Sequence, residues 1–345
     1  MTQPRTSRLS TRPERLRKGD TVAVFSPSSS VPSFFPERLD RAERELERLG
    51  FRVRRGAHVT DRTGYTAGFA EQRAQELNDA FADPQVSAIL CSIGGNNSNQ
   101  LLDQIDYDTI RRNPKVLLGY SDSTALVVAV WQMTGLVTFH GPGVLPEFGE
   151  FPGVMPYTER SFLETICEAR SPRKLSPPDS WTDEYAEWAD PENWTRTRPQ
   201  TPNAGWRGVR SGVGEGHLVG GNLETLLKLA GTPFWPDLDG AILFWEEARQ
   251  TVAQVDAHVT QLRQMGVFSQ IAGMVIGRPY HCDASVDIEF AEVVDEKLSS
   301  VAFPVLADVD LGHTDPMLTL PIGIRTRLVV DDGAYELTVL DPAVA

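Results

Sequence analysis

The strongest candidate for chemistry in the chain is the run Gly119-Tyr-Ser-Asp-Ser123. An apolar stretch precedes it and a predicted helix follows, so Ser121 falls on a strand-to-helix turn. A serine on such a turn projects its hydroxyl above a sheet edge, and the N–H of Asp122 at the helix start can receive an oxyanion. Ser121, Asp122 or Ser123 could equally cap the helix, so these residues alone leave a nucleophile and a cap both open.

A serine nucleophile needs a base and a carboxylate that orients the base. Among the six histidines, His313 lies in a loop that follows a predicted strand, from which a side chain can reach across a sheet edge. Glu246 and Glu247 directly follow the apolar stretch 241–245. His313 could instead be an ordinary loop residue, and the two acids could mark a helix start, where the helix dipole favours them. Periodicity does not decide between these interpretations.

Two further features could bind a ligand. The glycine-rich turn 94–99 could offer backbone N–H groups to a phosphate or an oxyanion, or be a plain turn. It lacks the lysine and spacing of a P-loop, and GxGxxG is absent, so a nucleotide cofactor is not indicated. The other feature is a cluster of tryptophans, Trp181, Trp188, Trp194 and Trp206, in a polar stretch. These rings could stack on a nucleobase or anchor a loop.

Composition excludes several classes of function. The 345 residues include 33 Lys and Arg against 47 Asp and Glu, a net charge of −14, so we expect no nucleic-acid partner. No apolar stretch is long enough to cross a membrane, and the Arg-rich start lacks the apolar segment of a secretory signal, so we expect a cytoplasmic protein. The three cysteines, Cys91, Cys167 and Cys282, are too widely spaced for a disulfide framework, and no cluster has metal-ligand spacing.

The elements that must position these residues alternate along the first half of the chain. Strands are predicted at 21–25, 51–53, 86–93 and 115–119, with helices at 36–49, 70–81 and 123–131. This alternation predicts an α/β domain with a mostly parallel sheet and helices on both faces. Beyond 210, strands are predicted at 241–245, 273–276, 304–309, 327–330 and 335–339, and helices at 223–229, 252–265 and 286–298. The last two strands read as a hairpin around Asp331-Asp-Gly333.

These patterns divide the chain into four parts. Residues 1–17 are expected to form a flexible tail, and residues 18–149 the N-terminal α/β domain. Residues 150–210, rich in Trp and Pro and without a clean period, predict a linker or lid. Residues 211–345 form the C-terminal domain.

Taken together, these pieces resemble the LD-carboxypeptidase family of serine peptidases, and most closely its microcin C self-immunity branch. The resemblance covers nearly the whole chain from about Asp20. It rests on five runs in one order, SIGGNNSNQLL at 92–102, LGYSDSTAL at 118–126, HLVGGNL at 217–223, LFWEE at 243–247 and GHTDP at 312–316. It implies a smaller mixed second domain with barrel-like strands, and usually a homodimer.

The resemblance also assigns roles to residues. Ser121 matches the family's nucleophile, Glu246 its acidic residue and His313 its base, and the backbone N–H groups of Gly95 and Asp122 would form the oxyanion hole. The implied reaction is hydrolysis of an amide bond through an acyl-enzyme on Ser121, with no metal or organic cofactor. Because the nucleophile lies in the first domain and the acid and base in the second, the site must be assembled across their interface.

Two substrate classes are implied by the family. The immunity branch cleaves the bond between an acidic aminoacyl group and an adenylate-like nucleotide, whereas the murein branch releases the terminal D-Ala of a cell-wall tetrapeptide. The glycine-rich turn and the tryptophan-rich stretch favour the first class, with Trp181, Trp188 and Trp194 as candidates for holding the nucleobase.

Two more residues are substrate-binding candidates in this resemblance. Asn222 could contact the substrate. The immunity branch tends to have a lysine four residues after the catalytic acid, as a partner for a phosphate, and this chain has Gln250 there. The adjacent Arg249 could bind the phosphate in its place. The alternative from another class is a catalytically silent protein that holds a peptide or nucleotide in the interdomain cleft. The presence of Ser121, Glu246 and His313 together argues against it.

Overall fold

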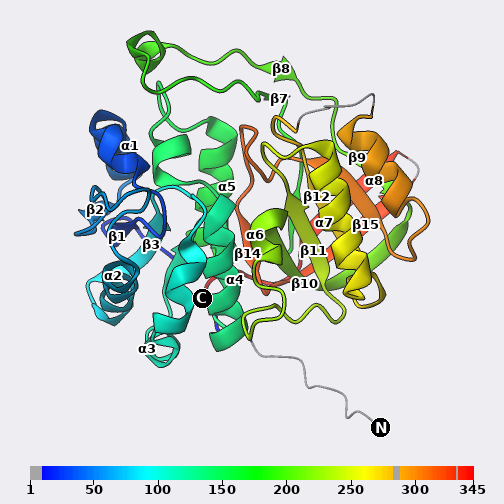
Figure 1. The fold of residues 1–345 in the computed structure, drawn as a ribbon, viewed down its shortest axis with the longest axis horizontal. Coiled ribbons are helices and arrows are strands. Elements are labelled where there is room, and N and C mark those ends of the chain that lie inside the picture. The colour runs from blue at the N-terminus through cyan, green and yellow to red at the C-terminus, as the bar shows by residue number, and fades with distance from the viewer. Residues whose placement is uncertain (1–9, 283–287, 332) are drawn as a thin grey trace.

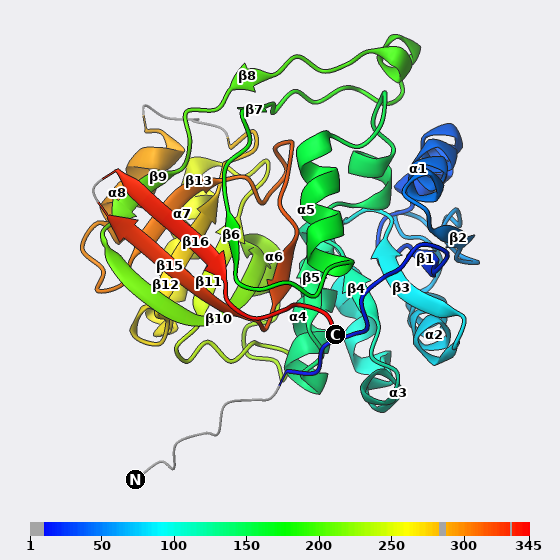
Figure 2. The same cartoon turned by 180° about the vertical axis from the view of Figure 1, so that it is seen from behind.

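Two β-sheets with flanking helices organise the chain (Figures 1 and 2). A computed structural model describes residues 10–282, 288–331 and 333–345. The first sheet and its helices α1 to α5 lie on one side of the molecule, and the second sheet with α6 to α8 on the other. This confirms the predicted α/β fold class.

The first sheet has six strands in the order β14-β5-β4-β3-β1-β2. Its strands are β1 Thr21–Phe25, β2 Arg52–Arg55, β3 Val86–Cys91, β4 Val116–Leu118, β5 Thr138–His140 and β14 Leu320–Ile322. All pairs are parallel except β14 with β5. The helices are α1 Pro36–Arg48, α2 Ala70–Ala82, α3 Tyr107–Arg112, α4 Thr124–Thr134 and α5 Pro156–Ile166. Short helical turns lie at η1 Val31–Phe34, η2 Ser98–Gln104 and η3 Ser121–Ser123, and a π-helix, η4, at Val144–Phe148.

The second sheet has eight strands in the order β6-β16-β15-β10-β11-β12-β13-β9 and is mixed. Its strands are β6 Arg173–Leu175, β9 Arg207–Arg210, β10 Gly212–Asn222, β11 Ile242–Glu246, β12 Gly273–Gly277, β13 Val305–Val309, β15 Arg325–Asp331 and β16 Ala334–Val339. The elements around it are α6 Leu223–Leu227, α7 Val252–Gln264, α8 Phe290–Leu298, η5 Pro191–Thr195, η6 Val267–Ser269 and the small ribbon β7 Ser180–Trp181 with β8 Thr201–Pro202. None of the helices in the described residues is long and apolar enough to cross a membrane.

Helix α1 shows how the pattern in the sequence becomes an element. Pro36 stands in its first turn, where a missing N–H costs nothing. Leu39, Ala42 and Leu46 recur at helical spacing and are all buried, while Asp40 and Arg44 between them are exposed. The predicted helix over 36–49 is therefore confirmed.

The stretch 150–210 is more regular than predicted, since it contains helix α5 and the strands β6 to β9. The buried face of α5 has helical spacing, but three of its five members are hydroxyl residues, Thr158, Ser161 and Thr165. A pattern of apolar residues therefore does not reveal the helical spacing of this buried face. Strands β6 and β9 form the two edges of the second sheet, so this stretch is part of that sheet and does not merely connect the two halves.

Residues 10–17 pack on the body, so the expectation of a flexible tail is wrong for them. Leu16 is buried, and its N–H donates to the Ile166 carbonyl over 2.8 Å. Thr11 pairs with Leu136 in an isolated bridge. Residues 1–9 of the predicted tail lie outside the described residues.

Strand β14 comes from the second half of the chain but extends the first sheet, with Leu320 opposite His140 on β5. The sequence did not predict it, because it has three residues and contains Pro321. The segment that carries His313 therefore returns into the N-terminal sheet.

Two predictions reach into residues that are not described, the start of the helix at 286–298 and Asp332 in the hairpin turn. The strands of that hairpin, β15 and β16, do pair antiparallel.

Candidate active site

Ser121 sits on the turn between β4 and α4 with a backbone φ of +59°. A residue other than glycine is strained in this left-handed region, and such strain is typical of a serine held above a strand-to-helix turn. The loop after β3 crosses directly over it. A Cβ on Gly94 would lie 2.9 Å from Ser121 Oγ and 3.1 Å from the Asp122 nitrogen, so only glycine allows this approach.

Glu246 is the last residue of β11, and its side chain is fully buried. Its Oε2 lies 2.8 Å from His313 Nδ1. Burial alone would raise the pKa of Glu246, but the imidazoles of His313 and His140, together with Asn222, lower it below its ordinary value. The carboxylate therefore stays ionised inside the protein.

His313 lies in the loop after β13, between Glu246 and Ser121. Its Nε2 is 3.0 Å from Ser121 Oγ. Because an ionised Glu246 only accepts hydrogen bonds, Nδ1 must carry the proton, which leaves the Nε2 lone pair to accept from the Ser121 hydroxyl. The imidazole packs between two tyrosine rings, with ring centres 5.0 Å away for Tyr120 and 5.8 Å away for Tyr280. This arrangement can remove a proton from Ser121.

The side chain of Asp122 connects the serine turn to the glycine-rich loop. Its Oδ2 accepts from the Ser98 N–H over 2.8 Å, and its backbone carbonyl accepts from Ser98 Oγ over 2.5 Å. Lys228 Nζ lies 3.7 Å from its Oδ1. The sequence offered this carboxylate only as one of three candidate helix caps, but in the structure it ties together the two segments that carry the Gly95 and Asp122 N–H groups.

A cavity of about 450 Å³ opens beside Ser121. Its wall combines loops of the first sheet, such as Ser29 and Gly95, with loops of the second, such as Tyr280 and His313. The segment 184–198 supplies the remaining side. The volume lies in the range of small-molecule sites.

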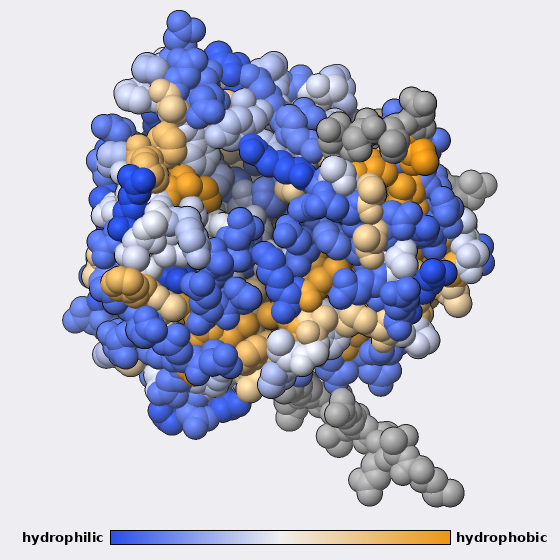
Figure 3. Space-filling view, viewed as in Figure 1, coloured by the Kyte–Doolittle hydropathy of each residue, from blue (hydrophilic) through white to orange (hydrophobic). Residues whose placement is uncertain are grey.

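The face of the molecule drawn in Figure 3 is mainly hydrophilic, with apolar side chains in a few separate groups.

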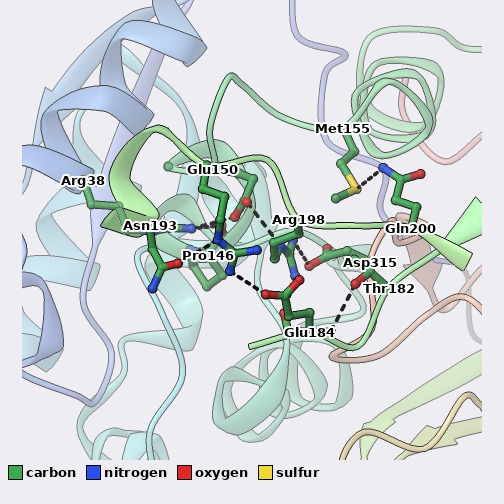
Figure 4. Close-up of polar contacts among 12 residues, drawn as sticks. Arg38, Pro146, Glu150, Met155, Thr182, Glu184, Asn193, Arg198, Gln200 and Asp315 are labelled. Atoms are coloured by element: carbon green, nitrogen blue, oxygen red, sulfur yellow. Dashed lines mark hydrogen bonds and ion pairs between the residues drawn. The ribbon is translucent and has the colours of Figure 1, made fainter. Parts of the chain in front are cut away.

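Arg198 holds the segment 184–198 over the cavity (Figure 4). Its Nε lies 3.1 Å from Glu150 Oε1, and its Nη2 lies 2.7 Å from Asp315 Oδ2. Arg38 adds a second ion pair to Glu150 over 2.9 Å. Burial opposes the charge of Arg198, but Asp315 and Glu150 outweigh it and raise the pKa of the guanidinium. The segment is thus tied to residues from both halves of the chain.

The structure separates the three tryptophans that were expected to act together. Trp188 lines the cavity, with the Arg38 guanidinium 4.2 Å from its ring centre. Trp181 packs under Arg278 instead, and Trp194 is exposed and donates from Nε1 to the Trp188 carbonyl. Neither Trp181 nor Trp194 lines the cavity. Trp206, outside it too, anchors its loop through a bond to Asp310.

The two other candidates for substrate contact also differ. Arg249 lines the cavity, and its guanidinium lies 4.9 Å from the ring centre of Tyr185. Asn222 does not line the cavity. It is buried at the start of α6, where its side chain accepts from the Thr225 N–H over 3.1 Å. In this position it caps α6 and lies beside Glu246, and its contact with a substrate stays a prediction.

Several residues of this site were missed by sequence reasoning. Tyr120 and Asp315 lie inside the runs GYSDS and GHTDP, so their nearness to Ser121 and His313 was a usable signal. Glu147 and Arg198 lie in irregular stretches and offered none. Among the described residues, no group of three or more His, Cys, Asp or Glu side chains could hold a metal ion.

Comparison with known proteins matches both halves of the chain to one family. Residues 22–141 match the LD-carboxypeptidase N-terminal domain, and residues 215–328 match the LD-carboxypeptidase C-terminal domain. Both matched ranges contain parts of the site: Ser121 lies in the first, and Glu246 and His313 lie in the second.

Individual relatives match over almost their full length. The microcin C7 self-immunity protein MccF of Escherichia coli is 35% identical over 327 residues, 94% of this chain and 94% of that protein. A probable murein peptide carboxypeptidase of Bacillus subtilis (strain 168) is 32% identical over 340 residues, 95% of this chain and 97% of that protein. The solved structure of MccF in complex with glutamyl sulfamoyl guanosine is similar with a TM-score of 0.91 and 33% identity, over 97% of this chain and 99% of that one.

Proposed function

This chain belongs to the LD-carboxypeptidase family and is a serine hydrolase, and from that premise we propose which residues perform the reaction and on what substrate. Ser121 is the nucleophile, His313 the base and Glu246 the carboxylate that orients the base. The observation that carries this proposal is the line of hydrogen bonds from Glu246 through His313 to Ser121, which ends at the wall of the cavity.

The reaction proceeds through an acyl-enzyme. His313 Nε2 takes the proton of Ser121 as Oγ bonds to the carbonyl carbon of an amide, and the N–H groups of Gly95 and Asp122 stabilise the oxyanion. The C–N bond then breaks, and the nitrogen leaves with the proton from His313. Water, deprotonated by His313, attacks the ester and releases a carboxylic acid and free Ser121. Glu246 stays ionised and stabilises the imidazolium in both steps.

The substrate we propose is an aminoacyl nucleotide in which an acidic aminoacyl group is joined through an amide-type bond. The similarity to MccF, whose solved complex contains glutamyl sulfamoyl guanosine, supports this choice. The cavity adds two aromatic rings, Trp188 and Tyr185, on which a base could stack, and the guanidinium of Arg249 for an anion. Of the three tryptophans considered, only Trp188 is therefore assigned to the nucleobase.

A second candidate is a murein tetrapeptide from which the terminal D-Ala is released. The similarity to the Bacillus subtilis murein peptide carboxypeptidase favours it. The same nucleophile, base and acid would serve, because both substrates present an amide carbonyl to Ser121. The aromatic rings of the cavity would then pack against the peptide.

The test offers both substrates to one preparation. Purified protein and its Ser121→Ala variant are incubated with glutamyl and aspartyl amide-linked nucleotides and with a murein tetrapeptide, and products are followed by mass spectrometry. Release of the acidic amino acid by the wild type alone supports the first proposal. Release of D-Ala alone supports the murein tetrapeptide as the substrate. Equal hydrolysis by the wild type and Ser121→Ala would show that Ser121 is not the nucleophile.

The homodimer implied by the family remains a prediction for this chain. Sedimentation equilibrium over a range of protein concentrations would check it. A single species at the mass of one chain, 38.1 kDa, would contradict it.

A further inference from the structure

Glu147 is a buried carboxyl group in the cavity wall that the reaction just described does not use. It lies on the π-helix η4 and is 5% exposed. Its Oε1 accepts from the Tyr120 hydroxyl over 2.8 Å, and its Oε2 accepts from the Gly143 N–H over 2.5 Å. Burying a carboxyl group is costly, and an apolar side chain would fill the same space. Its two hydrogen bonds therefore call for an explanation.

Tyr120 connects Glu147 to the reacting groups. It directly precedes Ser121 on the strained turn, and its ring centre lies 5.0 Å from that of His313 and 6.1 Å from that of His140. The ring is almost fully buried, so its position is set by these neighbours and by its hydroxyl group. A rotation of Tyr120 would move the surface on which the His313 imidazole rests.

We propose that Glu147 is a positioning residue. Through its hydrogen bond to Tyr120 it fixes the ring against which His313 packs, and thereby keeps Nε2 within reach of Ser121. This inference rests on the proposed roles of Ser121 and His313. Glu147 does not touch the reacting atoms, so its effect falls on the rate of the chemical step rather than on binding.

The charged neighbours of Glu147 make its own charge sensitive to pH, and this charge acts on the site separately from the hydrogen bond to Tyr120. Burial and the nearby Asp315 raise the pKa of Glu147 to about 8, while Tyr120, the Gly143 N–H and Arg198 act in the opposite direction. Arg198 is itself paired with Glu150 and Asp315, so its positive charge lowers the pKa of Glu147 only in part. Glu147 therefore loses its proton at a higher pH than an ordinary carboxyl group. Above pH 8 it gains a negative charge beside Asp315, which opposes the oxyanion that forms on the substrate.

The experiment uses a fluorophosphonate probe, which reports on Ser121 whatever the natural substrate is. The labelling rate is measured against probe concentration to separate the maximal rate from the half-saturating concentration. We expect Tyr120→Phe and Glu147→Met to lower the maximal rate at least tenfold, with the half-saturating concentration within about threefold of the wild type. Glu147→Gln keeps an acceptor for Tyr120 and is expected to retain most of the rate at pH 7.

Two comparisons separate positioning from general damage. The double variant Tyr120→Phe/Glu147→Met should be no slower than Glu147→Met alone, because both changes remove the same Tyr120–Glu147 hydrogen bond and only Glu147→Met also removes the acceptor of the Gly143 N–H. Tyr107→Phe is the matched control, since it removes a tyrosine hydroxyl that donates to the Leu102 carbonyl over 2.9 Å, outside the cavity. It should label at the wild-type rate. Thermal melts establish that each variant is folded.

The pH profile gives an independent readout. The wild type should lose labelling rate above pH 8, and Glu147→Gln, which has no ionisable group there, should keep its rate. Wild-type rates in Tyr120→Phe, additive losses in the double variant, or the same alkaline loss in Glu147→Gln would each overturn the inference. A wild type that is never labelled at Ser121 would instead overturn the proposed function, so the two failures are distinct.

Discussion

Glu246 and Glu247 are adjacent buried carboxyl groups that hold different histidines. Glu246 faces His313, whereas Glu247 Oε1 lies 2.6 Å from Nδ1 of His258 on α7. Their pKa values shift in opposite directions: burial is the main reason that the pKa of Glu247 is raised, while the pKa of Glu246 is lowered in spite of burial. The partner histidine, and not the sequence position, therefore separates the roles of the two acids.

This pair gives a matched prediction. Glu246→Gln should lower the rate of Ser121 labelling about 10³- to 10⁴-fold, because an amide can donate to Nδ1 and so favours the wrong imidazole tautomer. Glu247→Gln, which leaves His313 untouched, should stay within about threefold of the wild type while lowering the melting temperature. Labelling kinetics and thermal melts check both. Equal losses in the two variants would show that Glu246 has no special part.

Asp122 leads to a second prediction about one residue. Asp122→Ala removes the acceptor for the Ser98 N–H, so the loop that carries Gly95 loses a tie to the serine turn. The maximal labelling rate should fall about 10- to 100-fold, less than the loss expected for deleting an oxyanion donor outright. Lys228→Met removes a cation 3.7 Å from Asp122 and a 3.5 Å hydrogen bond to the Asn96 carbonyl, but it leaves both Ser98–Asp122 bonds in place, so it is the comparison variant and should lower the rate less than Asp122→Ala. An unchanged rate in Asp122→Ala would mean that the loop holds its place without the carboxylate.

Single residues were predictable from the sequence where a local turn defines them. Ser121 was a candidate because a strand, a turn and a helix follow one another within a few positions. Arg198 offered no such signal, because its partners Glu150 and Asp315 lie 48 and 117 positions away. The roles of Asn222 and Trp181 depend on where each side chain points, which only the packed structure determines.

Among the elements, helix α5 supports the segment that carries His313. Thr158 Oγ1 accepts from the Met317 N–H over 2.9 Å, and Ser161 Oγ accepts from the Thr319 N–H over 2.9 Å. The hydroxyl side chains that hid this helix in the sequence are thus the groups that hold the loop. An amphipathic pattern built from Ser and Thr is buried for its hydrogen bonds, which a hydropathy period does not detect.

This support can be measured with one substitution. Thr158→Val keeps the volume of the side chain but leaves the buried Met317 N–H without an acceptor, so we expect a loss of about 1–3 kcal/mol in the free energy of unfolding. Because the His313 loop loosens, labelling of Ser121 should also slow. Thr134→Val serves as the control, since its hydroxyl accepts from the Leu136 N–H over 3.0 Å at the end of α4. It should cost stability without slowing the labelling.

At the scale of the whole molecule, the sequence predicted two domains that meet at the site, and the described chain joins them more tightly. Strand β14 from the second half completes the first sheet, and β6 and β9 from the central stretch complete the second. The C-terminal residue also packs beside the first described segment, since the Ala345 N–H donates to the Pro13 carbonyl over 2.9 Å. Contacts between segments this far apart leave no trace in a local pattern, so the alternation of strands and helices indicated strands for both sheets but not that β14 crosses into the first one.

The crossing of β14 into the first sheet predicts how the molecule unfolds. Two independent domains would separate first, and activity would be lost before either sheet melts. Here the segment from Asp310 to Ile322 must leave β5 and α5 before the halves can part, and its departure removes His313 and exposes the edge of the first sheet. We therefore expect one cooperative transition in urea, with tryptophan fluorescence and Ser121 labelling lost at the same midpoint. Pro321→Gly offers a matched perturbation, because it loosens β14 without touching the cavity, and it should shift both midpoints together to lower urea. Two separate midpoints in the wild type would mean that the sheets are independent units after all.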